Sequence, residues 1–339
     1  MEQAHNHSSE LEKLTSVEDL VGVFLVTYNR SRYLERTLRQ ILSEKSPFRL
    51  CEITVLNNAS TDGTMDVVEH YRKKYSNLHL FSHPLNIGAS PNYLRAIEIS
   101  KKPYTWILGD DDLFDFSEVE DFRDMLGTGH YDLISIGSPG QRVWERGLCT
   151  TTQELARQGS RYFFTFSFIT GTIFRTALFT SECVYEGYKN CANLYPHFPF
   201  LAKCIENNCS VYITVSPMIV RDLADDSHHM PFLIWLLGWS LSFIIWVSPR
   251  WRKKMVFETL GKPWPDYLDD VVLAVVEYKA NHHHVPWHQL GAIAFSGWPL
   301  TLLWFPALLV ALLPTPAHKM IHRYLYRRST SQATDKFRL

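Results

Sequence analysis

The amino-acid sequence predicts an α/β fold, a mainly parallel sheet with helices on both faces, followed by a hydrophobic helical region. In the first half, short apolar runs alternate with segments whose apolar residues recur at helical spacing, which is typical of βα units. From about residue 230 this alternation stops and long uncharged stretches begin. We therefore expect a polar N-terminal segment (1–19), an α/β domain (20–228) and a helical region (229–339).

Four apolar runs predict buried parallel strands, each followed by a polar loop. The runs are residues 21–26, 53–56, 78–81 and 104–108. Helical periodicity between them predicts the crossover helices, on residues Leu34, Leu38, Ile41, Val68, Tyr71, Leu94 and Ile97. Because the carboxyl ends of parallel strands meet at one edge of a sheet, the polar loops should lie together there.

Beyond residue 113 the pattern is looser. It indicates helices over 118–126 and 194–205 and strands over 131–136 and 211–215, with an aromatic-rich stretch at 161–174. A formal net charge of −1 gives no general attraction to nucleic acid. Six cysteines without a CxxC pair, and no apolar signal-peptide core in residues 1–19, indicate a reducing compartment.

An acidic triplet, Asp110, Asp111 and Asp112, follows the fourth predicted strand after Gly109. Three neighbouring carboxylates repel one another and raise one another's pKa. A divalent cation is the usual compensation, because carboxylate oxygens are hard ligands. The triplet therefore predicts a metal–phosphate site, and a solvated acidic turn is the alternative.

Four motifs resemble those of family 2 glycosyltransferases of the GT-A fold: VFLVTYNR (23–30), LNNASTDGT (56–64), NIG (86–88) and LGDDDLF (108–114). The resemblance covers about residues 20–220. It implies a Rossmann-like sheet, a nucleotide-sugar donor, Mg²⁺ or Mn²⁺ as cofactor, and inversion at the anomeric carbon.

The resemblance also implies roles for individual residues. The nucleotide-sugar site would comprise Thr27, Asn29, Arg30, Asn58, Asp62, Asn86, Gly88, Asp110 and Asp111. Asp62 would hold the base edge, or would be only a turn or helix N-cap. Turn chemistry alone is also the alternative for Asn29 and Asn86. Asp110 and Asp112 would be the two acids of the family's DxD motif and the metal residues, with Asp112 on the metal and Asp110 near the ribose or a metal-bound water; Asp111 would have a lesser role.

Inversion by direct displacement needs a general base for the acceptor hydroxyl. Here the sequence departs from the family pattern, because no late Glu-Asp pair is found. His197 is one candidate, since its ordinary pKa of about 6.5 suits a base near neutral pH; a buried core histidine is the alternative. Asp225 and Asp226 are other candidates, and Thr170–Thr172 would shape the acceptor pocket.

Two negative observations narrow the function. The QxxRW motif of the family's processive synthases is not found, which favours transfer of a single sugar. His282, His283, His284 and His288 invite a zinc interpretation, but they lack carboxylate or thiolate company at ligand spacing. We expect a solvated or headgroup-facing loop there.

Two uncharged stretches predict membrane association. Residues 232–247 are about 16 residues long, short of the roughly 20 needed to span a bilayer. Residues 290–317 are long enough, contain Pro299, Pro306 and Pro314, and precede a basic aromatic tail at 319–328. We expect the first stretch in the interface and the second as a hairpin or one crossing.

The sequence thus predicts an enzyme at the cytoplasmic face of the cell membrane, peripheral or crossing it once. It would move a sugar to a polyprenyl-diphosphate-linked saccharide in surface polysaccharide synthesis, such as lipopolysaccharide O-antigen or capsule. The alternatives are a nucleotidyltransferase on a similar scaffold and a non-catalytic interaction protein with the same fold.

Overall fold

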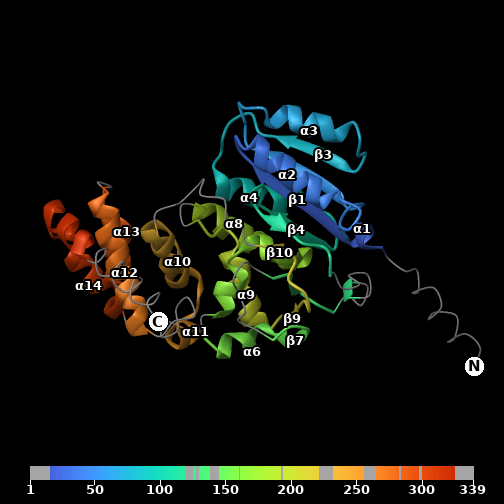
Figure 1. Cartoon of the computed structure of the whole chain (residues 1–339). Helices are drawn as coiled ribbons and strands as arrows, with labels where there is room; N and C mark the ends of the chain where they lie inside the picture. Colours follow the sequence, from blue (N-terminus) through green and yellow to red (C-terminus); the bar gives the residue numbers. More distant parts are fainter. Residues whose placement is uncertain are drawn as a thin grey trace, which may run out of the picture. The chain divides into compact units, whose positions relative to one another are not determined.

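The computed structural model divides the chain into two compact units (Figure 1). Unit 1 comprises Met1–Glu154, Thr165–Cys191 and Pro199–Leu223, and unit 2 comprises Leu155–Phe164, Ala192–Phe198 and Ala224–Leu339. The structure describes residues 16–118, 125–126, 130–137, 145–159, 161–191, 194–220, 232–255, 264–281, 284–297 and 300–324. Most of the helix predicted over 118–126 lies outside them.

Unit 1 is built on an eight-stranded sheet of order β3-β2-β1-β4-β8-β6-β9-β7. The strands are β1 (Val21–Thr27), β2 (Glu52–Asn57), β3 (Leu78–Ser82), β4 (Tyr104–Leu108), β6 (Leu133–Ser135), β7 (Leu148–Thr151), β8 (Thr172–Arg175) and β9 (Ser210–Ile213). β3, β2, β1 and β4 are parallel, as predicted. β8 runs antiparallel to both β4 and β6, and β7 runs antiparallel to β9, so the sheet is mixed.

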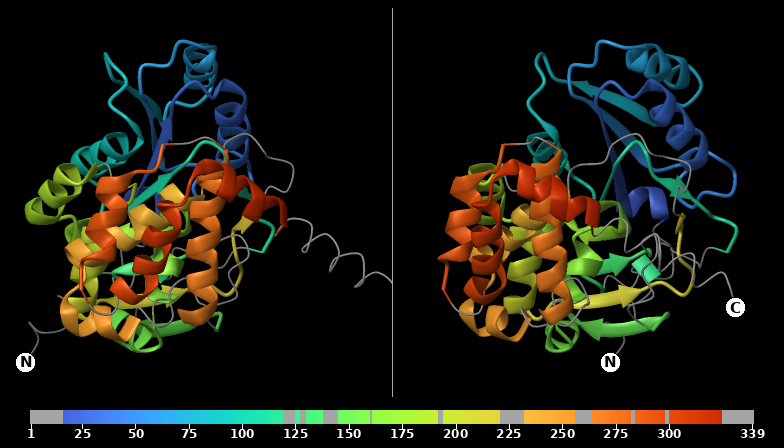
Figure 2. Two further views of the ribbon diagram at one scale, coloured as in Figure 1. Left: turned by 90° about the vertical axis from the view of Figure 1, so that its left-hand side faces the viewer. Right: turned by 60° about the vertical axis from the view of Figure 1, so that its left-hand side comes forward.

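The helices between the parallel strands cover both faces of the sheet. They are α2 (Ser31–Ile41), α3 (Thr64–Arg72) and α4 (Ala89–Ile99), and α1 (Val17–Leu20) precedes β1. Right-handed crossovers place α2 and α3 on one face and α4 on the other, because the strand order reverses after β3 (Figure 2). The predicted doubly covered sheet is therefore confirmed.

The remaining described helices and 3₁₀ turns before residue 208 follow β7 in the chain. They are α6 (Thr152–Arg157), α7 (Arg161–Phe166), η1 (Ile169–Gly171), η2 (Thr176–Leu178), α8 (Ser181–Lys189) and α9 (Phe198–Asn207). A separate two-stranded sheet joins β5 (Leu113–Phe114) to β10 (Ile219–Val220). The aromatic-rich stretch at 161–174 thus becomes a helix, a 3₁₀ turn and most of β8, an interior strand of the sheet.

Trp106 links the core of unit 1 to the loop after β4. Its ring is fully buried and packs on Phe48, with ring centroids 4.4 Å apart. Its Nε1 donates a hydrogen bond of 2.8 Å to the carbonyl oxygen of Thr170. A buried indole N–H needs such a partner, and this bond fixes η1 beside the end of β4.

The C-terminal part of unit 2 is helical: α10 (Phe232–Trp246), α11 (Pro249–Met255), α12 (Trp264–Ala280), α13 (Trp287–Ala294) and α14 (Leu300–Ala311). α14 packs against α12 and α13, and α10 packs against the same two helices. Their shared core includes Leu236, Val275, Leu290 and Trp304. The uncharged stretch at 232–247 thus becomes a largely buried core helix.

The predicted membrane association is not confirmed. Among the described residues, a single helix with the length and apolar character needed for a bilayer crossing is not found. Residues Leu300–Leu312 and Thr315–Tyr324 pass together on length and composition, but the two helices are bent by 114°. The stretch expected at 290–317 is therefore divided, since α13 ends at Ala294 and α14 at Ala311.

Candidate active site

The polar loops predicted to lie together do meet at one edge of the sheet. Thr27, the last residue of β1, is in register with Asn57, the last residue of β2. β4 ends at Leu108, which is in register with Leu25 of β1. The loops after three adjacent parallel strands therefore start within a few residues of one another along the same edge.

Asp110 is buried in this edge and satisfied by protein donors. Its side chain is 4% exposed. The hydroxyl of Thr27 donates to Oδ2 at 2.6 Å, and Nη1 of Arg30 donates to Oδ1 at 3.0 Å. The same Arg30 nitrogen lies 2.5 Å from Oδ2 of Asp111. One guanidinium thus compensates two carboxylates.

α2 also holds the backbone of the acidic loop. The hydroxyl of Thr37 donates to the carbonyl oxygen of Asp110 at 2.8 Å, and Nη2 of Arg36 donates to that of Asp111 at 2.6 Å. These anchors were missed in the sequence, where only the apolar spacing of α2 was interpreted. The signal was present, because Thr37 lies on the buried side of the helix beside Leu38.

Asp112 is held by the 3₁₀ turn η1. The hydroxyl of Thr170 donates to Oδ2 of Asp112 at 2.6 Å and accepts from the backbone N–H of Gly109 at 3.2 Å. The sequence assigned Thr170–Thr172 to an acceptor pocket, and this assignment stays a prediction. The structure instead links Thr170 directly to the third acid.

Burial sets the charge state of the acids. Desolvation raises the pKa of Asp110 to about 6 against the lowering effect of Thr27 and Arg30. Desolvation also raises the pKa of Asp112 to about 7; the Thr170 hydrogen bond opposes the rise, and the charges of Asp111 and Asp110 add to it. The solvated acidic turn offered as an alternative does not describe Asp110 or Asp112.

Gly109 lets the acidic side chains approach the backbone closely. A Cβ at this position would lie 2.9 Å from Oδ1 of Asp111, 3.5 Å from Oδ2 of Asp112 and 3.9 Å from the hydroxyl of Tyr93. The side chains of Asp111 and Asp112 thus converge over the Gly109 backbone. A side chain at position 109 would displace the carboxylate of Asp111.

The donor set fits the divalent cation that the family implies. Mg²⁺ is commonly bound through one or two carboxylates together with substrate phosphates. The converging oxygens of Asp111 and Asp112 meet that description. Among the described residues, a group of three or more potential ligand side chains is not found.

The loop after β2 is joined to the loop after β1. Oδ1 of Asn29, a residue with φ of 52°, accepts from the backbone N–H of Thr61 at 2.7 Å. Oδ2 of Asp62 accepts from Ser31 N–H at 3.0 Å, and Oδ1 accepts from Thr64 N–H at 3.0 Å. Although desolvation acts to raise it, these hydrogen bonds lower the pKa of Asp62. Asp62 thus caps two helices while its base-binding role stays a prediction.

Asn58 holds the loop at 86–88. Its Nδ2 donates to Oδ1 of Asn86 at 2.7 Å, and its Oδ1 accepts from the backbone N–H of Ile87 at 2.9 Å. Gly88, with φ of 91°, begins α4. Side chains other than glycine rarely adopt this backbone conformation. Asn58 is 2% exposed, so a buried amide side chain holds the loop that would close over a nucleotide.

The structure does not test the roles of the candidate general bases. His197 belongs to unit 2, is 3% exposed and lies near Tyr195, with ring centroids 6.3 Å apart. Asp225 and Asp226 lie outside the described residues, as do His282 and His283. The roles proposed for these residues stay predictions.

Comparison with solved structures identifies the fold as the GT-A type. The crystal structure of residues 1–349 of Staphylococcus aureus TarS superposes with a TM-score of 0.50 at 17% identity, covering 91% of this chain and 92% of that one. The same protein in complex with UDP gives a TM-score of 0.51.

The model named Glycosyl transferase family 2 matches residues 22–184. This region therefore belongs to glycosyltransferase family 2, and the resemblance drawn from the four motifs is confirmed.

Curated relatives are bacterial glycosyltransferases. Abequosyltransferase RfbV of Salmonella typhimurium is 33% identical over 94 residues, which is 27% of this chain and 28% of that protein. The putative teichuronic acid biosynthesis glycosyltransferase TuaG of Bacillus subtilis is 29% identical over 107 residues, 32% of this chain and 42% of that protein. The matches thus span less than half the length of these relatives.

Proposed function

We propose that this protein is a metal-dependent, inverting glycosyltransferase that moves one sugar from a nucleotide-diphosphate sugar to a saccharide acceptor. The observation that carries the proposal is Asp112, whose pKa burial raises to about 7 beside two further acids in a family 2 domain. Keeping such a group buried costs free energy. A cation and a diphosphate would offset that cost.

The donor would bind along the edge where β1, β2 and β4 end. Thr27, Asn29 and Arg30 would line the nucleoside pocket, and Asp62 would meet the base edge. Asn58 would keep the loop at Asn86 and Gly88 in place over the nucleotide. The UDP complex of TarS supports a nucleoside diphosphate as the ligand class.

Asp112 and Asp111 would hold the divalent cation, while Asp110 keeps Thr27 and Arg30 in position near the ribose. When bound, such a cation stabilises negative charge on a departing diphosphate. Arg30 forms ion pairs with two carboxylates. Its positive charge would lie beside the site where the phosphate oxygens bind. His197, Asp225 or Asp226 would take the proton of the acceptor hydroxyl.

The acceptor would be a polyprenyl-diphosphate-linked saccharide at the cytoplasmic face of the cell membrane. The relatives in O-antigen-type, teichuronic acid and poly(ribitol-phosphate) chemistry support surface polysaccharide or teichoic acid synthesis as the setting. The apolar helices of unit 2 support a lipid-linked acceptor.

A thermal-shift panel tests the proposal. UDP, other nucleoside diphosphates and nucleotide sugars are added with and without Mn²⁺ or Mg²⁺, and one should raise the Tm by mass action. Asp112→Asn should lose the metal-dependent part of the shift. No shift with any ligand at saturating metal would overturn the proposal. Release of pyrophosphate instead of a nucleoside diphosphate would identify a nucleotidyltransferase. Wild-type complementation by Asp110→Ala/Asp112→Ala would identify a scaffold.

A further inference from the structure

α14 is apolar on both of its sides, and within the described part of unit 2 one side is buried and the other is exposed. Leu300, Trp304, Ala307 and Ala311 recur at helical spacing and are at most 4% exposed. These four residues face the core shared with α12 and α13. A helix that is hydrophobic all round is normally surrounded by protein or lipid. We therefore expect the opposite side of α14 to contact protein or lipid.

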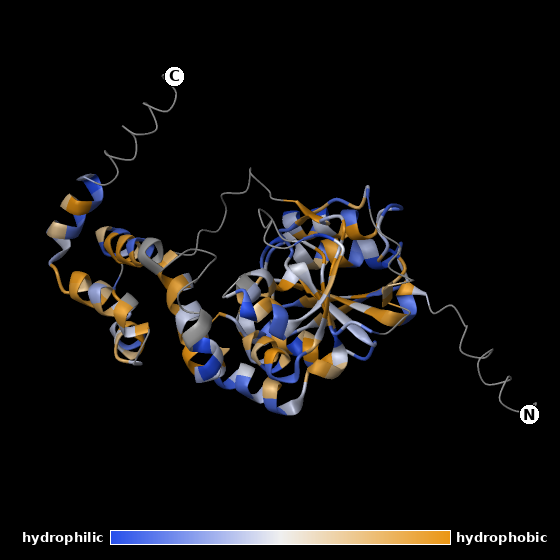
Figure 3. Cartoon of the chain, turned by 90° about the horizontal axis from the view of Figure 1, so that it is seen from below, coloured by the Kyte–Doolittle hydropathy of each residue, from blue (hydrophilic) through white to orange (hydrophobic). Residues whose placement is uncertain are grey.

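That opposite side continues beyond the helix. The outer apolar face consists of Phe295, Leu302, Phe305, Leu309 and Leu312, which are between 39% and 70% exposed. Four of them follow a helical spacing along α14, and Phe295 lies next to Phe305, with ring centroids 5.9 Å apart. Hydrophobic colour accordingly covers much of the helices near the C-terminus in Figure 3. Contiguous apolar patches of this kind mark interaction sites.

The sequence from the end of α12 onward is basic, whereas α12 itself, which packs against α14, also carries Asp269, Asp270 and Glu277. From residue 278 to residue 334 the sequence contains no aspartate or glutamate, but it contains Lys279, Lys319, Arg323, Arg327 and Arg328. A surface for a water-soluble partner has no need to exclude acids over such a length. An anionic lipid surface attracts basic residues beside an apolar face, so the charge favours a bilayer as the occupant.

Lys279 fixes the bend at the end of α14. Its Nζ donates to the carbonyl oxygen of Ala311 at 2.6 Å and to that of Leu313. These bonds satisfy carbonyls that the end of a helix leaves unpaired. The following helix, Thr315–Tyr324, departs at 114°. The two segments thus form a bent pair and not one straight rod.

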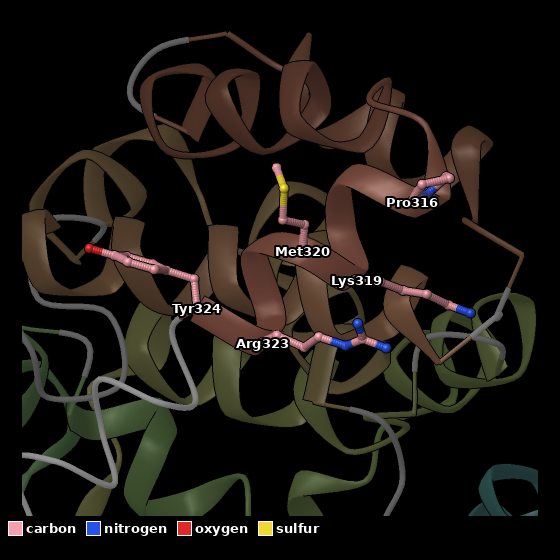
Figure 4. Close-up of a pocket in the computed structure, with 5 residues that line it drawn as sticks. All are labelled: Pro316, Lys319, Met320, Arg323 and Tyr324. Atoms are coloured by element: carbon pink, nitrogen blue, oxygen red, sulfur yellow. The ribbon is translucent and has the colours of Figure 1, made fainter.

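The helix after the bend carries two of these cations, Lys319 and Arg323. Lys319 and Arg323 line a hollow of about 540 Å³ together with Pro316, Met320 and Tyr324. In Figure 4 the two cationic side chains extend to the same side, while Tyr324 extends to the other. Two cations beside a methionine and a tyrosine suit a lipid phosphate with its adjoining hydrocarbon.

We propose that the outer apolar face, with Lys319 and Arg323, docks this protein on an anionic lipid bilayer as a peripheral contact. Leucine and phenylalanine side chains would enter the boundary between headgroups and acyl chains, and the two cations would meet lipid phosphates. The inference rests on the proposed location at a membrane and not on sugar transfer, so the two are tested separately.

The test is flotation of the full-length protein with vesicles of phosphatidylcholine, with and without phosphatidylglycerol. The wild type should float with the phosphatidylglycerol vesicles and less at high salt. Leu309→Glu/Leu312→Glu should weaken vesicle binding by more than about tenfold, because charges replace inserted leucines. Lys319→Gln/Arg323→Gln should weaken it by about fivefold per charge, on anionic vesicles alone.

Leu50→Glu in unit 1 is the matched control, because Leu50 is 64% exposed and Leu312 is 65% exposed. It should float like the wild type, and all variants should keep the UDP thermal shift. A wild type that stays with the unbound protein, or a Leu309→Glu/Leu312→Glu variant that floats normally, would overturn the proposal. A difference in oligomeric state between the wild type and the Leu309→Glu/Leu312→Glu variant, measured without vesicles, would also overturn the proposal. It would assign the face to a second copy of the chain.

Discussion

The two units break the usual pattern of burial in opposite ways: unit 1 buries charged groups, and unit 2 exposes apolar ones. Unit 1 encloses carboxylates at the edge of its sheet, with Asp110 almost fully buried. Unit 2 leaves Leu302 and Leu309 of α14 exposed to water. Each arrangement costs free energy; Thr27, Arg30 and Thr170 offset part of the cost at the acids. The contrast is the basis of the two proposals, in which a cation and a diphosphate would bind at the acids and a lipid surface at the exposed leucines.

Asp112→Asn gives the largest expected effect on unit 1. The amide keeps an acceptor for Thr170 but removes the charge, so turnover should fall by about 10³-fold while the fold is retained. Steady-state kinetics and circular dichroism measure the two effects. Asp115→Asn, at an exposed acid after β5, should leave turnover within about twofold. An Asp112→Asn enzyme with more than a tenth of wild-type activity would remove Asp112 from the chemistry.

Substitutions at adjacent positions of α14 separate its two sides. Trp304 is fully buried and Phe305 is 39% exposed. Trp304→Ala should lower the free energy of unfolding by about 4 kcal/mol, because it leaves a cavity. Phe305→Ala should cost less than about 1 kcal/mol. Urea denaturation measures both, and equal losses would show that the outer apolar face is part of the protein core.

Substitutions at Arg30 and Arg39 compare a partly buried ion pair with an exposed one. Arg30→Gln leaves Asp110 and Asp111 without their shared cation, so it should lower the free energy of unfolding by about 2 kcal/mol. Arg39 is 72% exposed and pairs with Glu35, and Arg39→Gln should cost at most about 0.5 kcal/mol. Similar values for the two variants would mean that water screens the acidic cluster.

The pH dependence of stability is the smallest expected effect. Because the folded protein raises the pKa of Asp112 from 3.8 to about 7, it binds the proton more tightly than the unfolded chain. Metal-free protein should therefore lose stability as the pH rises from about 4 to about 7. Asp112→Asn should flatten this slope and raise the Tm at pH 8 by about 3 °C. An unchanged slope in scanning calorimetry would contradict a buried, charged Asp112.

The acidic triplet shows which features of the site can be predicted from local sequence. The apolar run Tyr104–Leu108 predicts a buried strand, and the acids after it must lie at the strand's carboxyl end. The same reasoning brings Thr27 and the loop after β2 to this edge, because parallel strands share one direction. What local pattern does not contain is the partner of each acid. Thr170 is 58 residues from Asp112 in sequence, and only folding brings its hydroxyl within 2.6 Å.

The sequence by itself determined the order of strands and helices in the first half, the motifs of the family and the place of its polar loops, because periodicity and strand direction are local properties. The tertiary structure decided which carboxylates are buried, that Asp62 caps two helices, and that β8 enters the sheet antiparallel. It also decided which side of α14 is covered. An all-apolar helix gives no local signal of its inner side, since that side is chosen by the helices that pack against it.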